Sequence, residues 1–494
     1  MADEHHFLAL DLGAESGRGE LVTLAEGKVS MEEIHRFPSR NVRLAGTRYW
    51  DFPATFAEVL ESIRVCAERG VELSAISVDT WGVDFGLLGR DRQLLGLPVH
   101  YRDARTDGIH EKAAKVMPIE DIFAATALHT MPINTLFQLH AMQLADSPVL
   151  AAAETFLMMP DLFAYFLTGE RACELSDAQT SQLVGTDCQW SKEIIGRFGL
   201  PERIFPKLIE PATVIGPMTG EVVDQVGGCG GVPVVACAGH DTSAAVAAVP
   251  AQGANWAFCS CGTWSILGRL VDTPVASREC YEVGFTNEYT YGGWYLARNI
   301  LGLWLVQELR RKWDVPGDAW DYDRMTAEAT AAESGPLADV GDGRLLAPAD
   351  MEAALLEVLR DSGQGQPAGR GQLLRCVLES LALEYHWCVE TIGRLTGERP
   401  EAFYMVGGGI HNRLLCQLTA DACGMAVHAG ADQCTALGNA LGQALALGIL
   451  KSRDEIRDVM RASSEILTYE PQEPDLWAEK RERYRKLQGT KRWG

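Results

Sequence analysis

The sequence predicts an α/β protein of two domains, each a mixed β-sheet flanked by helices. Its 494 residues are too many for one hydrophobic core. Two stretches, 7–24 and 255–270, show the same order of strand, small-residue turn and strand, one in each half of the chain. A pattern that recurs in this way indicates one architectural unit used twice. We therefore predict domains 1–249 and 250–494, with the last helix as a candidate to pack back on the first domain.

The charge balance restricts the class of partner. The chain carries 67 acidic and 44 basic residues, a formal net charge of −23, which argues against nucleic acid or an anionic membrane as partner. The start of the chain lacks a signal-peptide pattern, and no apolar run reaches the roughly 18 residues of a membrane span. The 13 cysteines are scattered through apolar segments, as is typical of reduced thiols. We expect a cytoplasmic protein, monomer or dimer, and a bound nucleotide stays compatible with these features.

Apolar runs that end at glycine or charged residues give the elements in chain order. Buried strands read as short apolar runs, and these cover 7–12, 19–24, 29–37, 75–78, 85–88, 233–238, 256–260, 264–267 and 402–406. Helices read as longer segments, amphipathic or rich in small apolar residues, and these cover 53–69, 136–144, 160–166, 243–249, 297–313, 373–395, 410–422 and 435–447. Asp51 is placed to cap the first helix. Gly438 and Gly442 share one face of the last of these helices and permit a close helix contact.

The first candidate site is the turn after the first strand. Asp11 closes that strand, the turn from Gly13 to Gly17 is rich in small residues, and Arg18 follows. Backbone N–H groups in such a turn can surround phosphate oxygens, and Asp11 can hold Mg²⁺ through water. The same residues also suit an ordinary hairpin with an Asp–Arg pair. A short motif of this kind leaves both interpretations open.

A second candidate site follows the strand 233–238. Asp241 stands at a strand-to-helix turn, where open α/β sheets place their ligands. An aspartate in this setting more often caps a helix, although Thr242 can serve as the cap and His240 adds another polar group. A second small-residue turn, which contains Thr263, then follows as a phosphate turn or as a tight hairpin. The combination gives the hypothesis of phosphoryl transfer, with Asp241 as the base.

Other polar and glycine positions carry weaker signals. Trp81 and Gly82 after a strand suit either a sugar platform or a core aromatic with a turn. Asn299 and Gln307 suit either hydroxyl and nucleotide contacts or a polar helix face. The triple glycine 407–409 can admit a nucleotide against bare backbone or allow tight packing. The chain contains no phosphate-binding G-x-x-x-x-G-K-[ST] loop, and the triple glycine is not a dinucleotide motif.

Taken in this order, the motifs resemble those of the FGGY carbohydrate kinases, from the superfamily that includes actin, hexokinase and the heat-shock chaperone ATPases. The resemblance spans nearly the whole chain and is carried by ALDLGAESGR, ISVDTWGVDFGLL, AGHDTSAAV, SCGTWSILG, RNILGLWLVQE and MVGGGIHNRLLCQLTADACGM. It implies two actin-like, ribonuclease H-like domains with a catalytic cleft between them. DTWGVDF, GHDT and NILGLW point, within the family, to the members that act on L-rhamnulose.

The resemblance implies that ATP and Mg²⁺ are used to phosphorylate L-rhamnulose at O1, in L-rhamnose catabolism. It implies Asp241 as the base and Asp11 as the Mg²⁺ residue. The implied contacts with ATP are Ala14, Glu15, Ser16, Gly17, Arg18, Thr263, Gln307 and Gly408. The implied contacts with the sugar are Gly82, His240, Asp241, Thr242 and Asn299. Glu15 departs from the family, which often has serine there, and this leaves the side-chain role in that turn open.

Two alternatives remain at the level of sequence. The nearest is another ketose kinase of the family, acting on L-fuculose or L-xylulose. The other is an actin-like ATPase that binds partners and phosphorylates no sugar. The Trp81 turn and the GHDT turn count against the second alternative, because a protein that is not a sugar kinase needs no sugar platform. Fold by itself does not distinguish them.

Overall fold

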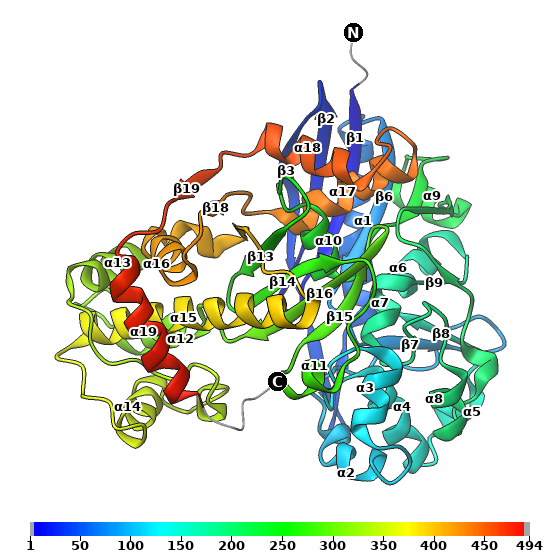
Figure 1. Cartoon of the computed structure of the whole chain (residues 1–494). Coiled ribbons are helices and arrows are strands. Elements are labelled where there is room, and N and C mark those ends of the chain that lie inside the picture. The colour runs from blue at the N-terminus through cyan, green and yellow to red at the C-terminus, as the bar shows by residue number, and fades with distance from the viewer. Residues whose placement is uncertain (1–3, 489–494) are drawn as a thin grey trace.

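The computed structural model describes residues 4–488, and in this range two large mixed β-sheets are flanked by helices (Figure 1). The first sheet has the order β11-β12-β6-β1-β2-β3. Its strands are β1 (His5–Leu12), β2 (Ser16–Ala25), β3 (Lys28–Pro38), β6 (Leu73–Thr80), β11 (Thr213–Pro217) and β12 (Pro233–Ala236). The second sheet has the order β15-β16-β14-β13-β17-β18-β19. Its strands are β13 (Trp256–Cys261), β14 (Ser265–Val271), β15 (Thr286–Thr290), β16 (Gly293–Ile300), β17 (Ala402–Val406), β18 (Val427–Ala429) and β19 (Leu467–Tyr469).

Short strand pairs and helices complete the chain. The pairs are β4 (Asn41–Leu44) with β5 (Thr47–Trp50), β7 (Phe85–Leu88) with β8 (Thr155–Met158), and β9 (Cys173–Glu174) with β10 (Leu208–Ile209). The helices of the first half are α1 (Phe52–Glu68), α2 (Ile109–Ala113), α3 (Ile119–Thr126), α4 (Thr135–Leu144), α5 (Pro148–Ala152), α6 (Met159–Thr168), α7 (Leu175–Thr180), α8 (Lys192–Arg197), α9 (Gly220–Val226) and α10 (Asp241–Ala247). Those of the second half are α11 (Arg278–Glu282), α12 (Trp304–Trp313), α13 (Tyr322–Ala331), α14 (Met351–Asp361), α15 (Arg370–Thr396), α16 (Arg413–Cys423), α17 (Cys434–Ala446), α18 (Arg453–Ser463) and α19 (Pro474–Leu487). Among residues 4–488, none of these helices has the length and apolar character that crossing a membrane requires.

The predicted repeat is confirmed by the strand pairing. β1 is antiparallel to β2 and parallel to β6, and β13 is likewise antiparallel to β14 and parallel to β17. Each of the two hairpin turns is also closed by a backbone hydrogen bond donated by a glycine within it. Gly13 donates its N–H to the carbonyl of Ser16 at 3.0 Å, and Gly262 donates its N–H to the carbonyl of Trp264 at 2.8 Å. Each half is therefore built around the same hairpin and its parallel neighbour.

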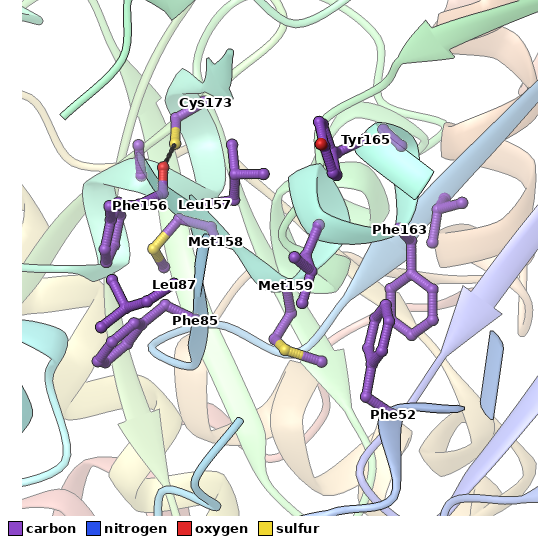
Figure 2. Packing of buried hydrophobic residues seen from close by; sticks show 14 of the residues in the cluster. Phe52, Phe85, Leu87, Phe156, Leu157, Met158, Met159, Phe163, Tyr165 and Cys173 are labelled. Carbon is purple, nitrogen blue, oxygen red and sulfur yellow. Dashed lines mark hydrogen bonds between the residues drawn. The ribbon is translucent and has the colours of Figure 1, made fainter. Parts of the chain in front are cut away.

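Aromatic packing joins helices α1 and α6 of the first half. Phe52, at the start of α1, packs against Phe163 of α6 with ring centroids 4.8 Å apart. Figure 2 shows this pair beside Met159, and shows the Cys173 thiol donating to the carbonyl of Phe156, at 3.7 Å. Asp51 caps α1 as predicted, because its side chain accepts the N–H of Ala54. Because α6 packs in turn on β6 of the first sheet, these contacts support the part of the sheet that carries the candidate site.

The two halves are joined by helices between the sheets. α17 packs against α10 and against β1 and β6 of the first sheet, and Gln443 of α17 donates to the carbonyl of Leu8 at 3.0 Å. α18 packs on β3, where Ser463 accepts the N–H of Val29 at 2.8 Å. The last helix, α19, packs instead on α15 and α16, on the far side of the molecule (Figure 1). Contact with the first sheet thus comes from α17 and α18.

The predicted helix 297–313 is wrong in its first part. Residues up to Ile300 belong to strand β16, and α12 begins only at Trp304. Gly302 separates the two elements with a φ of +52°, and a Cβ there would lie 2.7 Å from the N atom of Ser265. Only glycine fits such a left-handed position so close to neighbouring backbone. The first turn is also shorter than predicted, because β2 already begins at Ser16.

The close contact of α10 and α17 yields a stability prediction. A Cβ on Gly438 would collide with the backbone carbonyl of Ala244, which cannot move aside as a side chain would. We therefore expect Gly438→Ala to lower the free energy of unfolding by about 1–3 kcal/mol, the usual cost of overpacking. Urea unfolding followed by circular dichroism measures it.

Gly196→Ala is the matched control, because Gly196 lies in helix α8 with no atom within 4 Å of the added Cβ. Alanine is the better helix former, so this change should raise the stability by about 0.5–1 kcal/mol. Equal effects of the two substitutions would contradict the proposed helix contact.

Candidate active site

Adjacent parallel strands bring three aspartates together at one edge of the first sheet. Asp11 of β1 stands in register with Asp79 of β6. β12 runs parallel to β6 on its other side, and the chain after it stays in register, with Thr80 donating its N–H to the carbonyl of Gly239 at 2.8 Å. Asp241 follows two residues after Gly239. Carboxyl ends of parallel strands are where α/β sheets place ligands.

Crowding and burial govern the charge of these aspartates. Burial and, to a smaller extent, the nearby Asp241 raise the pKa of Asp11 to about 6, against the lowering effect of Arg18, opposite Asp11 in the hairpin. Burial and Asp11 also raise the pKa of Asp79. Asp79 accepts one hydrogen bond from Asn439 of α17 at 2.6 Å, while its other oxygen has no partner in the described part of the chain. A cation at this edge would relieve the repulsion between the carboxylates.

The donor set fits Mg²⁺ bound together with a phosphate. In residues 4–488 no three His, Cys, Asp or Glu side chains are arranged to hold a metal by themselves. Mg²⁺ commonly keeps several waters and binds through one or two carboxylates and the phosphates of a substrate. Asp11, partly exposed beside Asp241, suits this kind of site.

Asp241 is the first residue of α10. The N-cap residue of this helix is His240, whose side chain makes no capping hydrogen bond. The Asp241 carboxylate accepts the N–H of Thr242, and the Thr242 hydroxyl at 3.0 Å. It keeps 35% of its side chain exposed. The predicted candidates His240, Asp241 and Thr242 therefore lie together, with a carboxylate that a ligand can reach.

His240 lies between two carboxylates. Its Nδ1 is 2.9 Å from Oε2 of Glu288, and its Nε2 is 3.5 Å from Oδ1 of Asp241. Burial alone lowers the pKa of an imidazole, yet Glu288, Asp241 and the buried Asp177 outweigh it and raise the pKa of His240 to about 10. His240 is thus held as a cation beside the candidate base.

The first turn leaves only some of its amides available. The N–H of Gly13 is bonded within the turn, and Ser39 donates from its side chain to the carbonyl of Gly13 at 2.6 Å. Within residues 4–488 the amides of Ala14 and Glu15 make no hydrogen bond. The two are half-buried and exposed respectively. An anion could therefore bind at these two amides, with Arg18 three residues beyond Glu15, in β2.

Candidates of the second half gather at the end of β13. Gly262 and Thr263 accept the N–H groups of Leu303 and Trp304 at 3.0 and 2.9 Å, so the second turn rests on the start of α12. Thr263 is exposed, and Gln307 lies one helical turn along α12. Asn299 lies on β16, opposite Ile266 of β14, and is half-buried. The three candidates thus come from one hairpin and its neighbours.

In the triple glycine 407–409, two glycines serve tight packing and one leaves space for a ligand. A Cβ on Gly409 would collide with the Cys261 thiol, and one on Gly407 would lie 3.0 Å from the Cys261 carbonyl. These two glycines therefore allow close packing of the turn on the end of β13. Gly408 is exposed and has open space around it. Of the three, only Gly408 has space beside it for a ligand.

The Trp81 turn differs from the predicted sugar platform. Trp81 is buried, packs on Trp50 with ring centroids 4.1 Å apart and the ring planes tilted by 36°, and donates from its indole to Asp84 at 3.1 Å. The side of the indole that contacts Trp50 is therefore part of the core. Gly82 is half-buried, and a Cβ there would lie 2.8 Å from Thr180, whose hydroxyl accepts the N–H of Val83. The glycine is needed for this approach.

Several residues of the site were not singled out from sequence: Asp79, Asp177, Glu288 and Asn439. Asp79 closes an apolar strand in the same way as Asp11, and this signal could have found it. Glu288 and Asn439 come from the second half and reach the site only through the packing of the halves.

The sequence of the chain matches one family of enzymes. Residues 6–247 match the N-terminal domain of the FGGY family of carbohydrate kinases, and residues 257–447 match its C-terminal domain. A rhamnulokinase of Bacteroides thetaiotaomicron is 39% identical over 477 residues, which cover 96% of this chain and 97% of that protein. A rhamnulokinase of Enterococcus faecalis is 35% identical over 471 residues, 93% of each chain.

Solved structures share the fold at lower identity. The ligand-bound xylulose kinase of Lactobacillus acidophilus superposes with a TM-score of 0.81 at 17% identity, covering 97% of this chain and 96% of that one. The Plasmodium falciparum glycerol kinase with ADP gives a TM-score of 0.80 at 15% identity, covering 98% and 97%. The predicted two-domain, actin-like fold is confirmed.

The charge of His240 predicts a pH dependence of stability. Its pKa rises from 6.5 to about 10 on folding, so the folded chain holds a proton that the unfolded chain releases. The stabilisation is complete below pH 6.5 and is lost as the pH rises towards 10. The free energy of unfolding of the wild type should therefore exceed that of His240→Gln most at about pH 6 and least at about pH 10. Urea unfolding of both proteins across this range measures the difference, which a pH-independent offset would contradict.

Proposed function

The chain belongs to the FGGY family of carbohydrate kinases, and on this premise we propose that it transfers the γ-phosphoryl group of ATP to O1 of L-rhamnulose. The products are L-rhamnulose 1-phosphate and ADP, formed in L-rhamnose catabolism. The observation that carries the proposal is the likeness to rhamnulokinases over nearly the full length of both chains. The carboxylate edge of the first sheet supplies the chemistry.

Asp241 acts as the general base. Its exposed carboxylate takes the proton from the sugar O1 as this oxygen attacks the γ-phosphorus, a contribution worth roughly 10²- to 10⁴-fold in rate. Thr242 fixes the carboxylate through its N–H and hydroxyl, so that one oxygen keeps its direction. His240, Gly82 and Asn299 are the other proposed contacts with the sugar.

The hairpin turns hold the nucleotide. We assign the phosphates to the first turn, where Ala14 and Glu15 offer backbone amides, with Ser16, Gly17 and Arg18 following in β2. Thr263, Gln307 and Gly408 form the contacts of the second half. Mg²⁺, when bound with ATP, would supply positive charge to the phosphates, and Asp11 would hold it through water. Most of the catalysis in phosphoryl transfer comes from such positioning and charge neutralisation.

The remaining parts of the proposal concern organisation and location. The domains divide at residue 250, as 1–249 and 250–494, and ATP and sugar meet in the cleft between them. A cytoplasmic location suits the 13 cysteines, none of which is in a disulfide in the described chain and most of which are buried. The small-molecule partners are a ketose and ATP, in a monomer or a dimer.

A panel of ketoses tests the substrate. We expect kcat/KM for L-rhamnulose to exceed that for L-fuculose and for L-xylulose, since specificity is a ratio of these constants. ADP release in the presence of MgATP, with the phosphorylated ketose identified by mass spectrometry, measures it. A higher kcat/KM for another ketose would identify that ketose as the preferred substrate. ATP hydrolysis at a rate that no sugar alters would favour the actin-like ATPase.

Removal of the base has a defined expected effect. Asp241→Asn keeps the shape of the side chain and removes its basicity, so kcat should fall by about 10²- to 10⁴-fold. Asp224→Asn, at an exposed position on α9, is the matched control and should leave turnover unchanged. A turnover of Asp241→Asn within threefold of the wild type would show that Asp241 is not the base.

A further inference from the structure

The contact between His240 and Glu288 joins the two halves of the molecule at the base. His240 follows β12 of the first sheet, and Glu288 lies on β15 of the second. The side chains are 16% and 12% exposed and lie 2.9 Å apart. His240 presents its other nitrogen to Asp241. One imidazole therefore connects a strand of the second sheet with the carboxylate of the first half.

Glu288 is itself fixed by its neighbours. Tyr295, its cross-strand partner on β16, donates its hydroxyl to Glu288 at 2.7 Å. The same hydroxyl lies 3.1 Å from the hydroxyl of Ser243, in α10. Thr290 of β15 donates to the carbonyl of Ser243 at 2.7 Å. The strands β15 and β16 thus hold both the Glu288 carboxylate and the helix that begins with Asp241.

The backbone of the turn is held separately from its side chain. Glu174 accepts the N–H of Gly239 at 2.9 Å, and Ser176 accepts the N–H of His240 at 3.4 Å. Both acceptors precede or begin helix α7, from the first half. These bonds fix the main chain and leave the imidazole free to rotate about its side-chain torsions. Of the two carboxylates beside the ring, Glu288 lies closer, 2.9 Å from Nδ1 against 3.5 Å between Nε2 and Asp241, and so has the stronger hold on the ring orientation.

We propose that Glu288 is a positioning residue for the phosphoryl transfer, holding the His240 imidazole by Nδ1 so that Nε2 faces Asp241 and the sugar. The inference rests on the proposed function. Glu288 acts through His240 and touches neither the nucleotide nor the reacting oxygen. Because the carboxylate comes from the second half, the geometry at the base depends on how the two halves are placed.

Glu288→Gln tests the inference, since it keeps the size of the side chain and removes its charge. We expect kcat for the sugar to fall by about 10- to 100-fold, the scale of loss that a misplaced group near the chemistry produces. The KM for ATP should stay within about twofold, because the residues proposed to bind ATP do not contact Glu288. Glu282→Gln, at an exposed position on α11, is the matched control with unchanged kinetics.

A double mutant separates positioning from a general loss of structure. If Glu288 acts through His240, His240→Gln with Glu288→Gln should be no slower than His240→Gln alone, whereas independent effects would multiply. Nitrogen NMR of the imidazole, assigned by its loss in His240→Gln, should show a shifted His240 signal in Glu288→Gln. Multiplying effects, or an unshifted signal, would overturn the inference.

Tyr295→Phe is a second test of the same inference, for the case that the Glu288→Gln protein does not fold. It removes only the hydroxyl that holds Glu288, and we expect a loss of kcat of about 3- to 10-fold, with Tyr289→Phe on the same strand pair unchanged. An active enzyme in which Tyr295→Phe and Glu288→Gln both keep kcat within twofold overturns this inference alone. A wild type that phosphorylates no ketose overturns the proposed function itself.

Discussion

The rest of the site depends on the crowding of carboxylates at the edge of the first sheet. Parallel pairing of β1 with β6 and of β6 with β12 leaves Asp11, Asp79 and Asp241 no other place than one shared edge. Burial raises the pKa values of Asp11 and Asp79, and repulsion between the neighbouring carboxylates adds to this rise. A cation bound at this edge would relieve the repulsion, and in the function proposed above Mg²⁺ held with the phosphates of ATP has this role.

The second half contributes to this edge by close packing of small residues. Gly438 lets α17 approach α10 so closely that Asn439, the next residue, reaches Asp79. A buried carboxylate needs such a donor, because an unsatisfied one costs about 1–3 kcal/mol or more. The same approach places Gln443 against the carbonyl of Leu8 in β1. Stability of the core and geometry of the site thus depend on one helix contact.

The sequence was sufficient where a signal is local. An apolar strand that ends in aspartate identified Asp11 and Asp241, and the repeated hairpin identified two similar sheets. Local signals failed where packing decides. The indole of Trp81 is taken up by Trp50 and Asp84, from elements distant in the chain, and Asn299 is on a strand because Gly302 ends β16 before the helix begins. Glu288 and Asn439 give no local sign of their partners.

The two hairpins also show why a glycine-rich turn cannot be assigned whole to a ligand. In each hairpin one glycine uses its N–H to close the turn. At the end of β17, Gly407 and Gly409 are needed because a side chain at either position would press against Cys261. What remains for a ligand is small: the amides of Ala14 and Glu15, and the open side of Gly408. The Glu15 side chain is exposed at this point, and a carboxylate there would repel a phosphate if it pointed inward. In the function proposed above, phosphate recognition in the first turn therefore relies on the backbone, with Arg18 and Mg²⁺ supplying the charge.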